Sequence, residues 1–372
     1  MEQDKSCNLN VSWQERFQVF TNNLWKDIIK DKFIYLYCIT STVIIYISAV
    51  YLSLPIKYSL TTYFDIFYVA IYISILSWLV YCYFNLLIRR EKKPAKIMLI
   101  KLKNIIFPIN RIFSLFLLLI SLSISFSNYT FLKSVIPIIH PYGVDKVIIE
   151  IDRWLHFGVD PWVITHYIFS TPWSTLYLNA AYNAWFFLMW GVLFFFLIYN
   201  KKELLRKQFL ITFLLTWLIN GGVFAIIFSS VGPCYLELLT GNDIFSPLMQ
   251  RLNEQNVYLQ SVGSLPLWAL NTQSNLWQDY ITQSNGIGSG ISAMPSMHVS
   301  IAFLMSLALY QFRKSLGIFA YVFAIIIQIG SVHLGWHYAI DGYFSIISTV
   351  ALWKLIGHIL VKNNKKYYEN LE

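Results

Sequence analysis

Long apolar runs alternate with short polar segments along most of the chain. Eight runs approach the length of about 20 apolar residues that a helix needs to cross a bilayer. They comprise residues 33–54, 63–88, 109–127, 175–199, 208–229, 295–312, 315–334 and 339–361. The pattern predicts an all-α, polytopic membrane bundle of about eight transmembrane helices.

The composition supports a membrane protein. Of the 372 residues, 57% are hydrophobic and only 13% are charged, whereas soluble domains have about 25% charged residues. The net charge of +9 would suggest a nucleic-acid partner in a soluble protein. Here the basic residues lie in short clusters between apolar runs, so membrane topology explains them and we expect no nucleic-acid partner.

The distribution of basic residues predicts the orientation. If the N-terminus is cytoplasmic, 21 lysines and arginines fall on the cytoplasmic side and five on the opposite side. This agrees with the positive-inside rule. The five are Lys57, Lys133, Lys146, Arg153 and Arg251. We therefore expect both termini in the cytoplasm, and the plasma (inner) membrane as the location if the protein is bacterial.

Two of the expected outer segments are long. In residues 128–174, the stretch 144–157 has apolar residues at helical spacing, which predicts an amphipathic helix that either lies on the membrane interface or caps the bundle. Asp152 and Arg153 would form its solvated face.

The second outer segment, residues 230–294, is polar and rich in Asn, Gln, Gly and Pro. A loop of this length is uncommon unless it is functional or disordered. Trp268 and Trp277 are suited to anchoring it in the headgroup layer.

Candidate chemistry is concentrated in two segments that the topology places on the outer surface. The first is residues 286–298, GIGSGISAMPSMH. Pro295 suits the first turn of a helix, where free backbone amides and the helix dipole favour a phosphate. His298 would lie in that turn and reach a bound phosphate or a leaving oxygen.

The second segment is residues 331–341, SVHLGWHYAID. His337 and Asp341 are four residues apart and would share one face of a helix. The carboxylate would hold the imidazole in one tautomer, as a nucleophilic or general-base histidine requires. One histidine would attack phosphorus while the other protonates the leaving oxygen, with no metal or cofactor. A purely structural pair, or a metal site formed with His333, are the alternatives.

Pro295-Ser296-Met297-His298, followed by His337 and Asp341, resembles the second and third signature motifs of the type-2 phosphatidic acid phosphatase superfamily. Within it the chain looks most like the inositol phosphorylceramide synthase branch of inositolphosphotransferases. The resemblance implies a phosphohistidine at His337, Asp341 as its partner and His298 as general acid. It also implies that Pro295, Ser296 and Met297 surround the phosphate.

The resemblance covers residues 107–361, which would form a six-helix catalytic core. Residues 1–106 would then be a cytoplasmic leader with two additional helices, and residues 362–372 a basic cytoplasmic tail. The superfamily's phosphatases carry a Lys-x6-Arg-Pro motif that the chain lacks. Ser331 stands where they have an arginine, and residues 230–237 resemble instead the Gly-Pro segment of the synthase branch. Arg251 and His333 are the candidates to replace the absent cations.

These observations favour a phosphotransferase that moves a phosphoryl or phospho-headgroup from a lipid phosphate or phospholipid donor to a lipid acceptor. A lipid phosphate phosphatase, with water as acceptor, is the alternative within the same chemistry. A transporter or binding protein is an alternative from another class, although transporter sites usually lie near the bilayer midplane. A metal-dependent membrane hydrolase is a further alternative.

Overall fold

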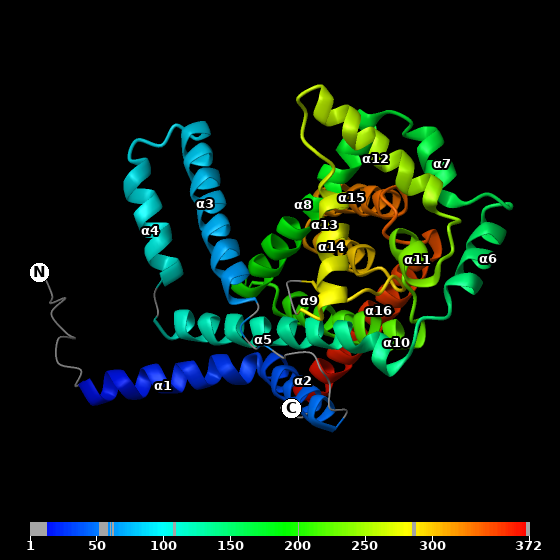
Figure 1. The fold of residues 1–372 in the computed structure, drawn as a ribbon. Helices are drawn as coiled ribbons and strands as arrows, with labels where there is room; N and C mark the ends of the chain where they lie inside the picture. Colours follow the sequence, from blue (N-terminus) through cyan, green and yellow to red (C-terminus); the bar gives the residue numbers. More distant parts are fainter. Residues whose placement is uncertain are drawn as a thin grey trace, which may run out of the picture.

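The computed structural model describes residues 13–51, 59, 61, 63–106, 109–199, 201–284 and 288–369. Every regular element in these residues is a helix (Figure 1). Gly286, at the start of the first candidate segment, lies outside the described residues.

Seven helical stretches in the described part of the chain are long and apolar enough to cross a membrane. They confirm a polytopic helical bundle. These stretches are in α2 (Lys32–Tyr51), α3 (Phe64–Ile88), α5 (Ile109–Ile139), α8 (Pro172–Ile198), Glu203–Ile227, α15 (Lys314–His333) and α16 (Ala339–Glu369). The expected helix at 295–312 is present as α14 (Met297–Phe312), whose 16 residues make it shorter than the other seven.

Two spans differ from the expected boundaries. The expected helix at 109–127 continues to Ile139, which makes the first part of the supposed outer segment 128–174 helical. Its polar residues are satisfied within the bundle, since Thr130 bonds to Tyr63 and Asn128 donates to Ser41. The basic tail is also helical up to Glu369.

The stretch Glu203–Ile227 combines α9 (Glu203–Leu218), a π-helical turn η1 (Ile219–Phe224) and α10 (Ala225–Ile227). Gly221 in the turn faces Tyr129 of α5, and a Cβ there would lie only 2.5 Å from the ring. Glycine is therefore required for this close approach of the two helices.

The hydrophobic core lies between α5, α8, α9 and α14. Phe126 of α5 packs against Trp190 of α8 and against Phe213 and Trp217 of α9, with ring centroids 5.0, 6.0 and 5.1 Å away. Aromatic packing of this kind adds to the burial of apolar area. The six helices α5, α8, α9, α14, α15 and α16 thus surround a common interior.

The N-terminal helices lie beside this core (Figure 1). Helix α1 (Trp13–Lys30) packs on α5, while α3 and α4 (Pro94–Ile106) form a hairpin. A buried ion pair joins the N-terminal part to the core, since Arg206 donates to both oxygens of Asp31.

The remaining helices are short and lie near one end of the bundle (Figure 1). They are α6 (Asp145–Leu155), α7 (Pro161–Ile168), α11 (Pro233–Thr240), α12 (Ser246–Ser261) and α13 (Trp268–Thr282). The two candidate segments meet at this end.

Candidate active site

A cavity of about 330 Å³ brings the two candidate segments together. His298 and His337, 39 residues apart in the sequence, both line it, together with Pro295 and Met297. Its walls are mainly aromatic, and they include Tyr63, Phe126, Tyr129, Tyr182, Trp185, Phe186, Trp190, Trp217, Tyr235 and Trp336. Two titratable imidazoles therefore face one largely apolar chamber.

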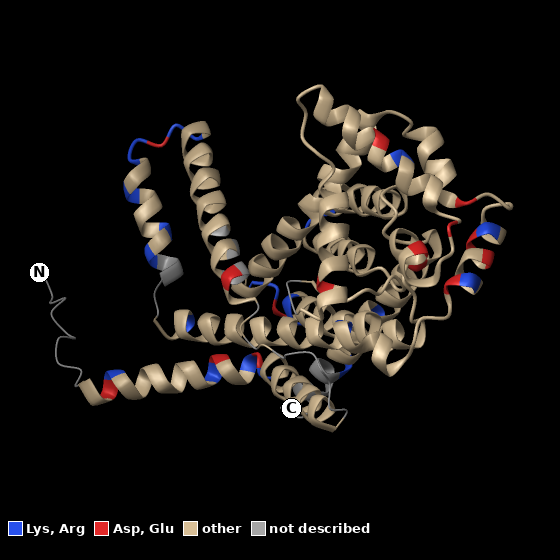
Figure 2. Cartoon of the chain, in the orientation of Figure 1, with Lys and Arg blue, Asp and Glu red and all other residues tan. Residues whose placement is uncertain are grey.

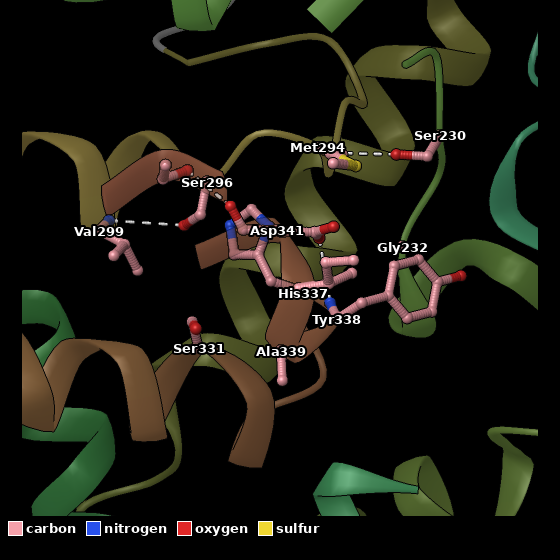
Figure 3. A network of polar contacts seen from close by, with 12 residues as sticks. Ser230, Gly232, Met294, Ser296, Val299, Ser331, His337, Tyr338, Ala339 and Asp341 are labelled. Carbon is pink, nitrogen blue, oxygen red and sulfur yellow. Dashed lines mark hydrogen bonds and ion pairs between the residues drawn. The ribbon is translucent and has the colours of Figure 1, made fainter. Parts of the chain in front are cut away.

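The four-residue spacing suggested that His337 and Asp341 lie on one helix. In the structure His337 instead precedes α16. Helix α16 begins at Ala339, and Asp341 in its first turn folds back towards His337 (Figure 3). Asp341 Oδ2 accepts the amide of Tyr338 at 3.0 Å and lies 3.4 Å from His337 Nδ1. A carboxylate at this position caps the helix and orients the imidazole in the same contact.

Ser331 supports the turn from below. Its carbonyl oxygen accepts the amides of Trp336 and His337, at 3.0 and 3.1 Å. The Ser331 hydroxyl donates to the carbonyl of Gln328 and is buried. The residue that replaces the superfamily's arginine thus holds the His337 backbone, and it does not line the cavity.

His298 is the second residue of α14 and packs between aromatic rings. Its imidazole stacks on Tyr182, with centroids 4.3 Å apart, and lies tilted against Trp185 at 4.2 Å. Ser296 is the N-cap of α14 and accepts the amide of Val299, so Pro295 lies before the helix and not in its first turn. The amide of Ser296 donates to the Asp341 carbonyl at 3.4 Å, which joins the two segments directly (Figure 3).

The turn at residues 230–232 contacts both candidate segments. Ser230 accepts the amides of Ala293 and Met294, both at 3.0 Å, through its carbonyl and its hydroxyl. Gly232 has φ +81°, and a Cβ there would lie 2.9 Å from Ala293 and from the Trp336 carbonyl. The glycine allows this turn to touch both candidate segments at once.

Helix α6 carries two buried carboxylates that fix the same region. Asp145 accepts the amides of Val231 and Gly232 and the hydroxyl of Tyr338. Asp152 accepts the amides of Ala339 and Ile340 at 2.9 and 3.0 Å. The free amides at the start of α16 are thus satisfied by Asp152.

The expectation that Asp152 lies on a solvated face was therefore wrong, since its exposed fraction is 3%. Burial raises the pKa of this carboxyl, and the two amide donors oppose that rise. Arg153 does lie towards the surface and pairs with Asp160 at 2.6 and 2.8 Å. Helix α6 caps the site end of the bundle through its two carboxylates.

Lys133 lies at the site, although the sequence did not predict it as a site residue. It lies on the extension of α5 and lines the cavity together with His298 and His337. Its Nζ donates to the Gly288 carbonyl at 3.1 Å. Gly290 has φ +91°, and a Cβ there would lie 2.7 Å from the Lys133 backbone, so this glycine lets the loop lie against α5 at that residue.

The two cation candidates named from the sequence lie outside the cavity lining. His333 bonds to Thr175 at 2.8 Å and stacks on His166 with centroids 3.7 Å apart. Arg251 donates to the carbonyl of Ser170 at 3.3 Å. His333 has partners of its own, distinct from those of His337 and Asp341, so the three side chains do not converge as the metal-site interpretation required.

The structure thus has two histidines at one cavity of a helical membrane bundle, with an aspartate behind one of them. In the family comparison, residues 146–355, more than half of the chain, match the model of the PAP2 superfamily. The chain belongs to this superfamily, whose membership supports a function of the lipid phosphatase or phosphotransferase type. No curated protein and no solved structure matches the chain. His298, His337 and Asp341 lie within the matched region, whereas Lys133 precedes it.

Proposed function

We propose that this protein is a lipid phosphotransferase of the inositol phosphorylceramide synthase kind, which moves a phosphoryl or phospho-headgroup between lipids through a phosphohistidine. The observation that carries the proposal is the pairing of His298 and His337 with Lys133 in one aromatic cavity. An apolar chamber suits lipid substrates, and a few polar groups within it define the reacting position.

His337 is the nucleophile. Asp341 faces its Nδ1 at 3.4 Å and holds the proton there, which leaves the Nε2 lone pair for phosphorus. Attack forms the N–P bond and breaks the P–O bond to the donor lipid, whose oxygen takes a proton from His298. The acceptor hydroxyl then returns a proton to His298 and attacks phosphorus, which breaks the N–P bond and restores His337.

Lys133 stabilises the negative charge on the transferring group. Within the described residues, no carboxylate forms an ion pair with this half-buried lysine, and a charge partly removed from water without a counter-ion is costly. A bound phosphate supplies that counter-ion. A fixed cation in a cavity sheltered from water also stabilises the transition state more than it would in water.

The orientation follows from the basic residues. The predicted topology assigns the larger share of lysines and arginines to the side opposite the two motifs, so we propose that the reaction takes place at the outer or lumenal face. The aromatic lining supports a lipid acceptor over water, because it provides an apolar surface for a second lipid chain.

The test is turnover by purified protein in detergent, with a panel of lipid phosphates, phospholipid donors and ceramide or diacylglycerol acceptors. We expect wild type to form a new phospholipid and a covalent, acid-labile label from a ³²P donor. His337→Ala should abolish both. His358→Ala, an exposed histidine outside the cavity lining, is the matched control and should retain both.

Each other outcome contradicts a part of the proposal. Release of free phosphate without a new lipid would establish a phosphatase. Turnover by His337→Ala would refute the assignment of the nucleophile, and loss of wild-type turnover in EDTA would indicate a metal-dependent hydrolase. Specific lipid binding without turnover by wild type would favour a binding or transport role.

A further inference from the structure

The turn between α12 and α13 has an apolar surface that the proposed chemistry does not use. Its exposed side chains are Val257, Tyr258, Val262, Leu265 and Trp268, and Leu265 is 58% exposed. We define these five residues as the hairpin tip. They belong to a segment, residues 255–278, that contains no Lys, Arg, Asp, Glu or His. Figure 2 shows this turn without charged residues, whereas charges occur earlier on α12.

Four backbone amides of the turn are bonded within the hairpin. The amides of Val262, Gly263 and Ser264 donate to carbonyls of α12, and the amide of Leu267 donates to the side chain of Asn256. Pro266, also in the turn, has no amide hydrogen. A loop that meets lipid must satisfy its polar backbone groups in this way, because hydrocarbon offers no partners.

The depth of the turn follows from its contact with α8. The amide of Ala269, next to Trp268, donates to the side chain of Asn179 at 2.9 Å. Asn179 lies seven residues after Pro172, the first residue of α8, and so about 10 Å along this membrane-spanning helix.

The length of α8 allows the position to be compared with the hydrocarbon boundary. Its 27 residues extend about 40 Å, against a hydrocarbon core of about 30 Å. If the excess is shared between both ends, Asn179 lies about 5 Å inside the hydrocarbon. The adjacent Trp268 therefore lies at the depth where interfacial tryptophans are found.

The surface of α8 continues the tip. Trp173 and Tyr177, in the first two turns of α8, are 54% and 61% exposed. Both α12 and α13 pack on this helix. The exposed aromatic residues at the start of α8 and those of the tip thus lie on helices that pack together, one of which crosses the membrane.

We infer that the hairpin tip inserts into the lipid leaflet at the site end of the bundle. Its occupant is the acyl and headgroup boundary of the surrounding bilayer, because the tip lacks charge, bonds most of its amides internally and lies at the depth of that boundary. Since Ala269, Thr272 and Leu276 of α13 line the cavity, the inserted hairpin forms one wall between lipid and the reacting groups. This last consequence rests on the proposed function, whereas insertion does not.

Insertion is tested by spin labels in phosphatidylcholine nanodiscs. A cysteine at Leu265 is compared with one at Asn253, an exposed polar position on α12, in a chain whose four cysteines are replaced. The label at 265 should be relaxed more by oxygen than by a water-soluble nickel chelate, and the label at 253 should show the reverse. Water-like behaviour at 265 would overturn the inference, as would spin–spin broadening there, because it would place a second copy of the chain on the tip.

If the cysteine-free chain does not fold, quenching by brominated phosphatidylcholine replaces the labels. Wild type should lose more tryptophan fluorescence in the brominated lipid than Trp268→Phe does. Equal fractional quenching of the two proteins would overturn the inference.

The catalytic consequence is tested with Leu265→Asp, which places a charge at the boundary. Turnover of a donor lipid in vesicles should fall about tenfold or more, while turnover of a short-chain, monomeric donor should persist. Asn253→Asp, on the same helix pair, should change neither. Equal loss on both donors would refute the role in lipid entry. A wild type inactive on every lipid would refute the proposed function and leave the spin-label result standing.

Discussion

Two cations at different places in the bundle, Arg206 buried and Lys133 half-buried at the cavity, have opposite surroundings. Arg206 is 2% exposed, and both of its terminal nitrogens donate to Asp31, at 2.8 Å for the Nη2–Oδ2 contact. Lys133 faces the cavity and donates only to a backbone carbonyl among its recorded contacts. Burying a charge is costly unless it is paired. The ion pair with Asp31 thus explains Arg206 as a structural link, whereas Lys133 has no such partner among the described residues and calls for a ligand.

The largest expected effect is on catalysis at Lys133. Lys133→Met keeps the length of the side chain and removes the charge, so kcat should fall about 10²–10³-fold, as when one donor to the transition state is lost. Thermal stability in detergent should be unchanged or higher, because a half-buried charge without a counter-ion is removed. Initial rates and melting curves of one preparation measure both. A stable variant with wild-type kcat would contradict the role of Lys133.

The ion pair should show the converse. Asp31→Leu leaves Arg206 buried without its partner, which should cost about 3–5 kcal/mol of stability. Activity per folded molecule should be retained, because the pair is not part of the cavity lining. Chemical unfolding in detergent measures the loss. The double variant Asp31→Leu/Arg206→Met should recover much of it, and failure to recover would show that the pair is more than an electrostatic link.

Gly290 allows the loop to lie against α5 at Lys133, so a substitution there tests whether the position of Lys133 depends on the loop. Gly290→Ala adds a Cβ 2.7 Å from the α5 backbone at a position with φ +91°, and the conformational strain alone is about 1–3 kcal/mol. Gly241→Ala has similar strain, at φ +72°, but its Cβ would meet open space and the residue does not line the cavity. We expect both variants to lose stability and only Gly290→Ala to lose activity beyond what unfolding explains. Equal activity of the two variants would show that the loop does not position Lys133 for catalysis.

The two regions also differ in how far the sequence predicts them. The apolar runs predicted the helical bundle, and the paired motifs predicted that His298, His337 and Asp341 share one site. The sequence predicts the end of α5 too early, because Ser, Thr and Asn interrupt its apolar pattern near residue 128. The residues that bond to Thr130 and Asn128, Tyr63 and Ser41, are remote in sequence.

That error concealed Lys133. Placed in an outer loop, it was one basic residue among five; placed within a membrane helix, a lone lysine calls for a functional explanation. The apolar run at residues 135–139 immediately after it was the available signal. The burial of Asp152 could not be predicted, because its partners are backbone amides of α16, 187 and 188 residues further along.

The smallest expected effect concerns a buried group that stays neutral. His166 is 2% exposed, its Nε2 donates to the His333 carbonyl, and its Nδ1 has no recorded partner. Burial lowers the pKa of His166 to about 4, with the nearby Arg251 acting in the same direction. Protonation would place a charged N–H in an apolar site, beside the stacked His333 ring, without an acceptor.

The sign follows from linkage. The unfolded chain takes up this proton near pH 6.5 and the folded chain only near pH 4, so stability is highest above pH 6.5 and declines as the pH falls between these values. His166→Gln removes the titrating group and keeps a side-chain donor for the His333 carbonyl. Melting temperatures from pH 7.5 to pH 4 should therefore fall less steeply in the variant. The buried Asp152 carboxyl acts in the opposite direction in both proteins, because its pKa is raised in the fold and its protonation then favours the folded state. An unchanged slope would contradict the prediction. It would mean that water reaches His166, or that His166 is already protonated in the fold and a buried position near Arg251 holds a second cation without a counter-ion.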